Sequence, residues 1–302
     1  MISAVFHYLG PSFAVLLFAH IEPLGVAWLR IFSAAIVLTI WRRPWRLLRN
    51  ARASQWRLYL GMGAVLAVMN SLFYLAVARL PLSTVGAIEF LGTVVLAAVG
   101  TKSLRNWAAL GLAIAGVVLL TEIRIVDSPL GVVFAFANCA AFVAYVLLGH
   151  RIANPPRPSA DATDATATPT AAGIDVLAVS MLIGAVMVAP LAGFATPAFV
   201  HPAWLMWAVG VGVCSSVIPY VTDQLAMARL PRATFALMLA LLPAVATLVG
   251  LLVLRQIPSA LDIIGIALVT AGVILHRDMK PADARTKEQE LKTSEEQWTT
   301  SD

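Results

Sequence analysis

Charged residues are scarce in this sequence. Asp, Glu, Lys and Arg together make up only 12% of its 302 residues. Cysteine is scarcer still: the only two are Cys139 and Cys214, and each lies within a long apolar stretch. Two isolated thiols in such surroundings indicate buried packing positions and give no sign of a redox or metal function.

The sequence signatures of common enzyme sites are also missing. We find no glycine-rich phosphate loop, no nucleophile elbow and no zinc signature. Four of the five histidines, His20, His150, His201 and His276, lie at the ends of predicted helices without metal-ligand spacing. We therefore expect no cofactor and no metal, and a protein that is not an enzyme and does not drive transport with ATP by itself.

Apolar residues, in contrast, make up 60% of the chain, above the roughly 45–50% of soluble domains. A helix of about 20 apolar residues crosses a hydrocarbon core of about 30 Å, and the runs here lack the alternation of membrane β-strands. The first run starts at Met1 without a basic leader or a small-residue cleavage site, so we interpret it as a retained helix. Ten runs are candidate transmembrane helices: 2–21, 23–41, 58–78, 82–100, 106–121, 129–149, 174–197, 204–226, 233–253 and 259–276.

Positive charges are distributed unevenly between the two ends of these helices. If the amino terminus is inside, the inner loops and tail contain 17 Lys and Arg residues, and the outer loops contain three. The positive-inside rule then predicts that both termini are cytoplasmic. The basic stretch 42–57, with tryptophans among its arginines, predicts contact with anionic lipid headgroups and no binding of nucleic acid.

Two segments of the chain repeat each other. "LAVARLP" at 75–81 and "LAMARLP" at 225–231 share six of seven residues at an offset of 150, and "AGVVLL" at 115–120 pairs with "AGVILH" at 271–276. Duplication of an odd number of helices places the two halves in opposite orientations, as in secondary transporters. We therefore predict an all-α membrane protein with ten transmembrane helices arranged as two inverted five-helix repeats.

The predicted repeats occupy 1–151 and 174–277. Between them, 152–173 is rich in Pro, Ala and Thr and has no apolar face, which predicts a flexible cytoplasmic linker. After the second repeat, 278–302 is charged and poor in apolar residues, which predicts a disordered cytoplasmic tail.

Three segments carry a resemblance to a known family: "GVAWLRIFSAAIVL", "SLFYLAVARLPLSTVGAIEFLGTVV" and "SSVIPYVTDQLAMARLPRATFALMLALLPAVATLVGLLVL". In this order and spacing they resemble the EamA-type branch of the drug/metabolite transporter superfamily, and in particular its threonine/homoserine exporters. The resemblance implies a ten-helix inverted-repeat fold in the cell inner (plasma) membrane. It also implies export of small metabolites, often amino acids, coupled to proton movement.

The chain departs from the family pattern at three places. Leu242-Pro243 stands where relatives often have Glu-Pro, Arg255-Gln256 where "GE" is common, and Thr93 where a proline often follows "EFxG". The carboxylates that relatives carry in the second half are therefore missing, so coupling chemistry that depends on them has to lie elsewhere or be absent.

Ionisable residues inside the predicted spans are the first candidates for a functional site, because a charge at the bilayer centre costs about 2.5–3.5 kcal/mol. At 1.5 Å per residue, Arg30, Asn70 and Glu89 lie about 10–13 Å below the outer boundary. We expect them to line a central cavity, where Arg30 binds a substrate carboxylate and Glu89 binds an amino group or a coupling proton. The alternative is a purely structural Arg30–Glu89 pair, and Arg30 is the partner we expect for Glu89.

The second half supplies further polar candidates in "SSVIPYVTDQ". At the offset of 150, Tyr220 corresponds to Asn70 and Gln224 to Tyr74, so these pairs are expected to face the same cavity. Asp223 is either part of this site or a carboxylate near the inner end that is solvated or paired with Arg229. The predicted binding or coupling residues are Arg30, Asn70, Tyr74, Glu89, Ser215, Ser216, Tyr220, Asp223 and Gln224.

Two prolines and one histidine complete the candidates. Pro219 and Pro243 are predicted helix breaks, because proline removes a backbone donor and frees a carbonyl. His7 could bind a proton, although a hydrogen-bonded packing role is the expected one.

The function predicted from these observations is secondary active export of small metabolites. We expect amino acids similar to threonine and homoserine as substrates, alternating access, proton antiport, and a monomer or weak homodimer in the lipid bilayer. The alternatives are efflux of lipophilic drugs, or a non-transporting scaffold or sensor that signals through its tail.

Overall fold

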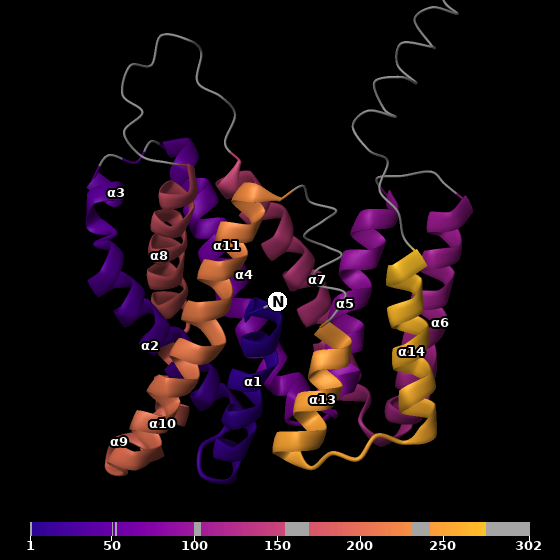
Figure 1. Ribbon diagram of the computed structural model, residues 1–302. Coiled ribbons are helices and arrows are strands. Elements are labelled where there is room, and N and C mark those ends of the chain that lie inside the picture. Colours follow the sequence, from indigo (N-terminus) through magenta and orange to yellow (C-terminus); the bar gives the residue numbers. More distant parts are fainter. Residues whose placement is uncertain are drawn as a thin grey trace, which may run out of the picture.

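The computed structural model describes residues 2–49, 51, 53–99, 104–154, 169–230 and 242–275. These ranges are helical almost throughout and contain no strand, which confirms the predicted all-α class. The helices stand side by side as a bundle (Figure 1). Most of the predicted linker, 155–168, and the predicted tail lie outside the described residues.

In the first half of the chain, the described helices match the first five predicted runs, except for one short helix, Trp45–Arg49, that no run predicted. They are α1 (Ile2–Leu16) with the 3-10 turn η1 (Leu17–Ala19), α2 (Pro23–Arg42), α3 (Trp45–Arg49), α4 (Ala53–Val77), α5 (Leu82–Val99) and α6 (Leu104–Asp127). The remaining elements are α7 (Pro129–Ala153), α8 (Pro169–Met187), η2 (Ala189–Ala195), α9 (Thr196–Val200), α10 (Pro202–Gly212), η3 (Val213–Val217), α11 (Ile218–Arg229), α13 (Leu242–Leu254) and α14 (Ala260–Leu275).

Four stretches of the described residues are long and apolar enough to cross a membrane as single helices. They are Pro23–Arg42, Gln55–Val77, Pro129–Ala153 and Pro202–Arg229, and a fifth results if Gly173–Met187 and Ala189–Val200 form one bent span. Further apolar helices are shorter than 18 residues. The structure thus contains several candidate spans, and the full number of ten remains a prediction.

The seventh predicted helix differs from its expected course. A single helix over 174–197 is expected, but α8 starts at Pro169 and ends at Met187, and the chain then bends by 66° into η2 and α9. Pro190 lies at the start of η2 and cannot donate a backbone hydrogen bond to the preceding turn. The α-helix therefore ends before it.

The eighth predicted helix is continuous but irregular. Between α10 and α11 the backbone forms the π-helical segment η3, and Pro219 follows at the start of α11. A π-bulge inside an α-helix is uncommon and frequently marks a functional site. Pro243, the other predicted break, is the second residue of α13, and residues 231–241 before it lie outside the described ranges.

Glycines allow α6 and α14 to approach each other closely, and the two helices stand side by side in Figure 1. A Cβ atom at Gly116 would clash with the backbone of Gly265, and one at Gly272 would clash with the backbone of Ala109. Small residues at such contacts are typical of helix packing in membranes. The two contacts run in opposite directions along the chain, so α6 and α14 are antiparallel.

The surface of the bundle is apolar and its centre is partly polar. Val200, Met206 and Ile274 each expose more than 70% of their surface, whereas Arg30 and Glu89 are 3% and 2% exposed. Soluble proteins almost never bury charges while exposing large apolar residues. This inverted distribution is that of a protein surrounded by lipid.

Contacts between helix ends define two ends of the bundle. Arg42 pairs with Asp175 at 2.7 Å, and Arg105 donates to the carbonyl of Leu275 at 2.6 Å. At the other end, the Leu82 backbone N–H donates to Gln256 Oε1 at 3.1 Å. Gln256 thus satisfies a donor at the start of α5 that has no partner within its own helix.

Candidate functional site

A small cavity of about 10 Å³ lies in the centre of the bundle. A cavity of this size holds about one water molecule. Its lining contains four of the predicted site residues, so the structure places these four around one space. The lining residues are His7, Arg30, Met69, Asn70, Phe73, Glu89, Asn138 and Tyr220.

Arg30, on α2, is held by groups from the second half of the chain. Its Nε donates to Ser216 Oγ at 2.7 Å, and one Nη donates to the Ser215 carbonyl at 2.6 Å and to the Tyr220 hydroxyl at 3.5 Å. The guanidinium also lies over the ring of Tyr74, 5.4 Å from its centroid, a cation–π arrangement. Arg30 is therefore satisfied mainly by neutral groups, and its positive charge has no direct counter-ion among the residues that the structure describes.

The backbone explains why the Ser215 carbonyl is available to Arg30. In an α-helix this carbonyl would accept from the N–H of the residue four positions later, which is Pro219 and has no N–H. Gly10 of α1 packs directly against the backbone of Ser215. This close approach requires glycine, because a Cβ atom at position 10 would clash with Ser215. Pro219 and Gly10 together bring η3 and its free carbonyl into the centre of the bundle.

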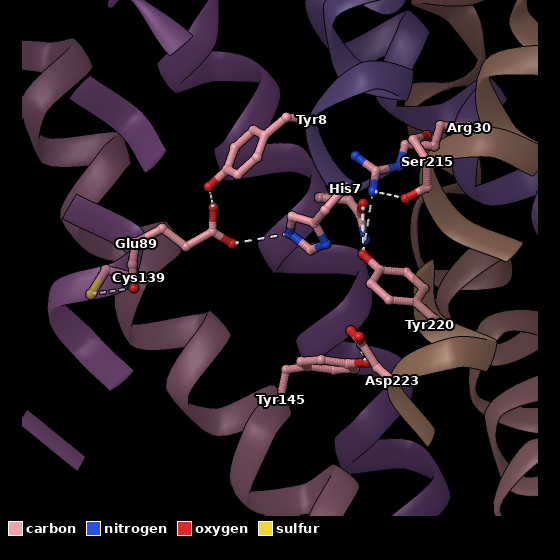
Figure 2. A network of polar contacts seen from close by, with 10 residues as sticks. His7, Tyr8, Arg30, Glu89, Cys139, Tyr145, Ser215, Tyr220 and Asp223 are labelled. Carbon is pink, nitrogen blue, oxygen red and sulfur yellow. Dashed lines mark hydrogen bonds and ion pairs between the residues drawn. The ribbon is translucent and has the colours of Figure 1, made fainter. Parts of the chain in front are cut away.

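Glu89, on α5, has partners on α1. Its Oε1 lies 3.6 Å from His7 Nε2, and its Oε2 accepts a hydrogen bond from the Tyr8 hydroxyl at 3.3 Å. The expected pairing with Arg30 is wrong: within the described ranges the carboxylate points toward His7 and Tyr8 (Figure 2). Helix rise predicted that Arg30 and Glu89 lie at a similar depth. Which side chains contact each other depends in addition on how the helices are arranged around the cavity.

Asn70 and Tyr220 meet directly across the site. The Tyr220 hydroxyl donates to Asn70 Oδ1 at 3.2 Å, and Asn70 Nδ2 donates to the Leu66 carbonyl at 2.7 Å. These two residues correspond at the offset of 150 between the repeated segments. Contact between corresponding residues is the geometry expected close to a two-fold axis that relates two halves.

The remaining predicted residues lie beside the cavity and not on its wall. Ser215, Ser216 and Tyr74 surround Arg30. Asp223, one turn further along α11, is 2% exposed and accepts a hydrogen bond from the Tyr145 hydroxyl at 3.3 Å, so it is not the solvated carboxylate considered above. Gln224 is also buried, close to Gly149 and Gly173.

Helix α7 contributes residues that the sequence analysis missed. Asn138 and Phe142 are one helical turn apart, and Tyr145 follows one turn later. Phe142 packs its ring against His7, and Tyr145 packs against Tyr220 with 5.3 Å between ring centroids. The sequence offered one sign of this contribution, because Asn138 is a lone asparagine within the apolar run 129–149.

Asn138 is fully buried, and neither atom of its amide has a hydrogen-bond partner among the described residues, a property that it shares with Gln224. Leaving a buried polar group without a partner costs about 1–3 kcal/mol. Such a group in a cavity wall needs a bound water or ligand to complete its hydrogen bonds.

The described residues contain no group of three or more His, Cys, Asp or Glu side chains that is placed to hold a metal ion. Cys139 is buried next to Glu89, with its thiol 3.8 Å from the Glu89 carbonyl oxygen, and Cys214 is partly exposed. The chemistry available at the site is therefore that of one cation, one anion, a histidine, and several amide and hydroxyl groups.

Comparison with known proteins agrees with the resemblance drawn from the sequence. A model of the EamA-like transporter family matches residues 165–277. The threonine/homoserine exporter RhtA of Salmonella typhimurium (strain LT2) is 29% identical over 87% of this chain and 84% of the relative, and RhtA of Escherichia coli (strain K12) is 28% identical over the same shares.

A solved crystal structure is similar to this chain over most of its length. It matches with a TM-score of 0.57 and 17% identity, covering 90% of this chain and 93% of the other. At this identity the likeness shows the fold alone. The resemblance predicted from the sequence is thus confirmed: residues 165–277 match the model of the EamA-like transporter family, and the chain is similar over most of its length to threonine/homoserine exporters.

Proposed function

We propose that this protein is a secondary active exporter of small amino acids of the threonine/homoserine type, located in the inner membrane. One observation carries the proposal: a buried cation, Arg30, and a buried anion, Glu89, line the same small cavity, and each has other partners among the described residues. An α-amino acid carries a carboxylate and an ammonium group. Arg30 suits the carboxylate, because a guanidinium binds it through two parallel hydrogen bonds, and Glu89 suits the ammonium group.

The transport mechanism that we propose is alternating access between two inverted five-helix repeats. In the two predicted repeats, α1, α4 and α5 correspond to α7, α11 and α13. The packing supports this relation, because the contact of α1 with α13 has its counterpart in that of α7 with α5. The contact of α4 with α7 likewise has its counterpart in that of α11 with α1. The two glycine contacts between α6 and α14 are also counterparts of each other, because Gly116 and Gly272 occupy the same position in the repeated segments 115–120 and 271–276. Since the cavity holds about one water molecule, its walls have to separate before an amino acid enters, as alternating access requires.

We further propose that Glu89 and His7 carry the coupling proton. The imidazole of His7 can accept and donate a proton, and it lies 3.6 Å from the buried Glu89 carboxylate. A proton bound by this pair would compete with the substrate ammonium group for the same carboxylate. That competition produces antiport, because protonation releases the substrate on the side where it occurs.

The test is efflux of labelled threonine or homoserine from loaded cells that express wild type, Glu89→Gln or Arg30→Ala at matched levels. We expect rapid efflux with wild type and strongly reduced efflux with both variants. Deletion of residues 280–302 is the control for the scaffold or sensor alternative, and we expect it to leave efflux unchanged. If both variants export as wild type does, the proposed site is wrong.

Efflux of lipophilic compounds is the second candidate, and one observation favours it. A groove of about 370 Å³ opens on the bundle surface and is lined by apolar atoms of α1, α10 and η3. Its lining residues are Gly10, Phe13, Trp207, Gly210, Val211 and Cys214. If this groove carried the substrate, Trp207→Ala would reduce efflux and Arg30→Ala would not.

A further inference from the structure

We infer that Asn138 selects for substrates with a hydroxyl group on the side chain. This inference rests on the proposed function, because it assigns a third recognition group to the same cavity. Arg30 and Glu89 account for the two charged groups that all α-amino acids share. They cannot distinguish one neutral amino acid from another, so selection requires a further polar group in the wall.

Asn138 is the lining residue best suited to that task. It is fully buried and lines the cavity from α7, whereas Arg30 is on α2 and Glu89 on α5. The polar lining groups Arg30, Asn70 and Tyr220 bond to one another or to backbone carbonyls, and Glu89 is held by α1. Among the polar lining residues, Asn138 is the one whose side-chain polar atoms all lack a hydrogen-bond partner within the described residues.

The position of Asn138 relative to the charged groups is fixed by its neighbours on α7. Cys139 contacts the backbone of Glu89, so α7 packs against α5 at the level of the carboxylate. Phe142, one turn after Asn138, packs its ring against His7, 5.9 Å between centroids. Asn138 therefore lies on the same inward face of α7, next to the group that we assign to the substrate amine.

The chemistry of an amide matches that of a hydroxyl. An asparagine side chain offers N–H donors and a carbonyl acceptor, and an alcohol both donates and accepts one hydrogen bond. A buried site that bonds to a hydroxyl rejects an analogue without one, because its own polar atoms then remain unpaired. Threonine and homoserine would satisfy Asn138, whereas valine and norvaline, which replace the hydroxyl by a methyl group, would not.

The experiment measures efflux from proteoliposomes that contain the purified full-length protein and are loaded with labelled threonine and valine, in equal amounts. For wild type we expect a preference for threonine of about tenfold or more. For Asn138→Leu we expect the preference to fall to about one, mainly through loss of threonine efflux. The homoserine and norvaline pair should behave in the same way.

Two further variants keep the result interpretable. Asn138→Ser retains a donor and an acceptor and should retain part of the preference even if the leucine variant fails to fold. Asn154→Leu is the matched control, because Asn154 bonds to backbone carbonyls at a helix end outside the cavity, and it should keep the wild-type ratio. If wild type exports threonine but both Asn138 variants keep its preference, the inference is wrong and the proposed function stands. If wild type exports neither threonine nor homoserine, the proposed function itself fails and the inference with it.

Discussion

Arg30 and Glu89 are both buried charges on the wall of one cavity, but they are held very differently. Arg30 donates hydrogen bonds at 2.6 and 2.7 Å to η3, whereas the contacts of Glu89 with Tyr8 and His7 are 3.3 and 3.6 Å long. The first two are short even for bonds to a charged donor, and the last is longer than a good hydrogen bond. The comparison shows an arginine bonded closely to η3 on one side of the cavity and a carboxylate with longer contacts on the other, which we interpret as an anchor and a loosely held acid.

Loss of the anchor should have the largest effect. Arg30→Ala removes several hydrogen bonds to a charged group, each worth about 1.5–3 kcal/mol, and also the proposed partner of the substrate carboxylate. We expect efflux to fall by about 100-fold or more, which corresponds to a loss of about 2.7 kcal/mol or more. The measurement is initial efflux of labelled threonine at equal protein levels in the membrane.

Two variants serve as controls for the anchor. Arg79→Ala removes an exposed arginine in the turn after α4, whose Nη1 donates to the Leu75 carbonyl at 2.8 Å and whose guanidinium lies over the Phe134 ring. Arg79 does not line the cavity, so this variant should leave efflux unchanged. Arg30→Lys keeps the charge but loses the planar fork, so intermediate efflux is expected. Full activity of the lysine variant would show that geometry at the anchor does not matter.

The loosely held carboxylate should affect coupling more than binding. Glu89→Gln keeps the size of the side chain but cannot release a proton, so we expect efflux driven by an imposed pH gradient to fall by about tenfold or more. Exchange of labelled for unlabelled threonine without a gradient should be reduced less. Asp175→Asn, which alters a half-buried acid at a helix end, is the control, and an equal loss of both activities in Glu89→Gln would argue against a role in coupling.

Substitution of the neighbouring histidine should have a smaller effect. His7→Gln retains hydrogen bonding to Glu89 but removes an imidazole that can take up and release a proton. We expect efflux to fall by about three- to tenfold at neutral pH, with a weaker dependence on pH between 6 and 8. An unchanged pH profile would restrict His7 to the packing role first expected for it.

The smallest effect is expected from the proline that frees the Ser215 carbonyl. Pro219→Ala restores an N–H that can bond within the helix and compete with Arg30. We expect the apparent KM for threonine to rise by about two- to fivefold, while the thermal stability of the purified protein is unchanged or higher. A lower stability together with an unchanged KM would mean that the π-helical segment does not depend on this residue.

Much of the fold could be predicted because bilayer length and hydrophobicity act locally along the chain. The apolar runs located the observed helices to within a few residues for α2, α5 and α7. The run 174–197 was wrong as a single helix, although Pro190 was a visible warning. Hydrophobicity does not register such a break, because proline and its neighbours there are as apolar as the rest of the run.

The candidate site was predictable only in part. The depth of Arg30, Asn70 and Glu89 follows from helix rise, and all three line the cavity. The contacts of Glu89 with His7 and Tyr8 and the unpartnered amide of Asn138 were not predicted. Both depend on how α1, α5 and α7 are rotated about their axes, and a helix that is apolar on every side gives no sign of which face points inward.

The sequence by itself thus determined the helical class, the positions of most apolar helices, the repeated segments and the depth of the buried charges. All of these follow from composition and from distances along one helix. Only the tertiary structure decided that Arg30 is anchored to η3 while Glu89 contacts α1, and that Asn138 faces the same cavity. The reason is physical: which side chains meet across a bundle is set by close packing between helices, where glycines such as Gly10 and Gly116 determine how near two backbones approach.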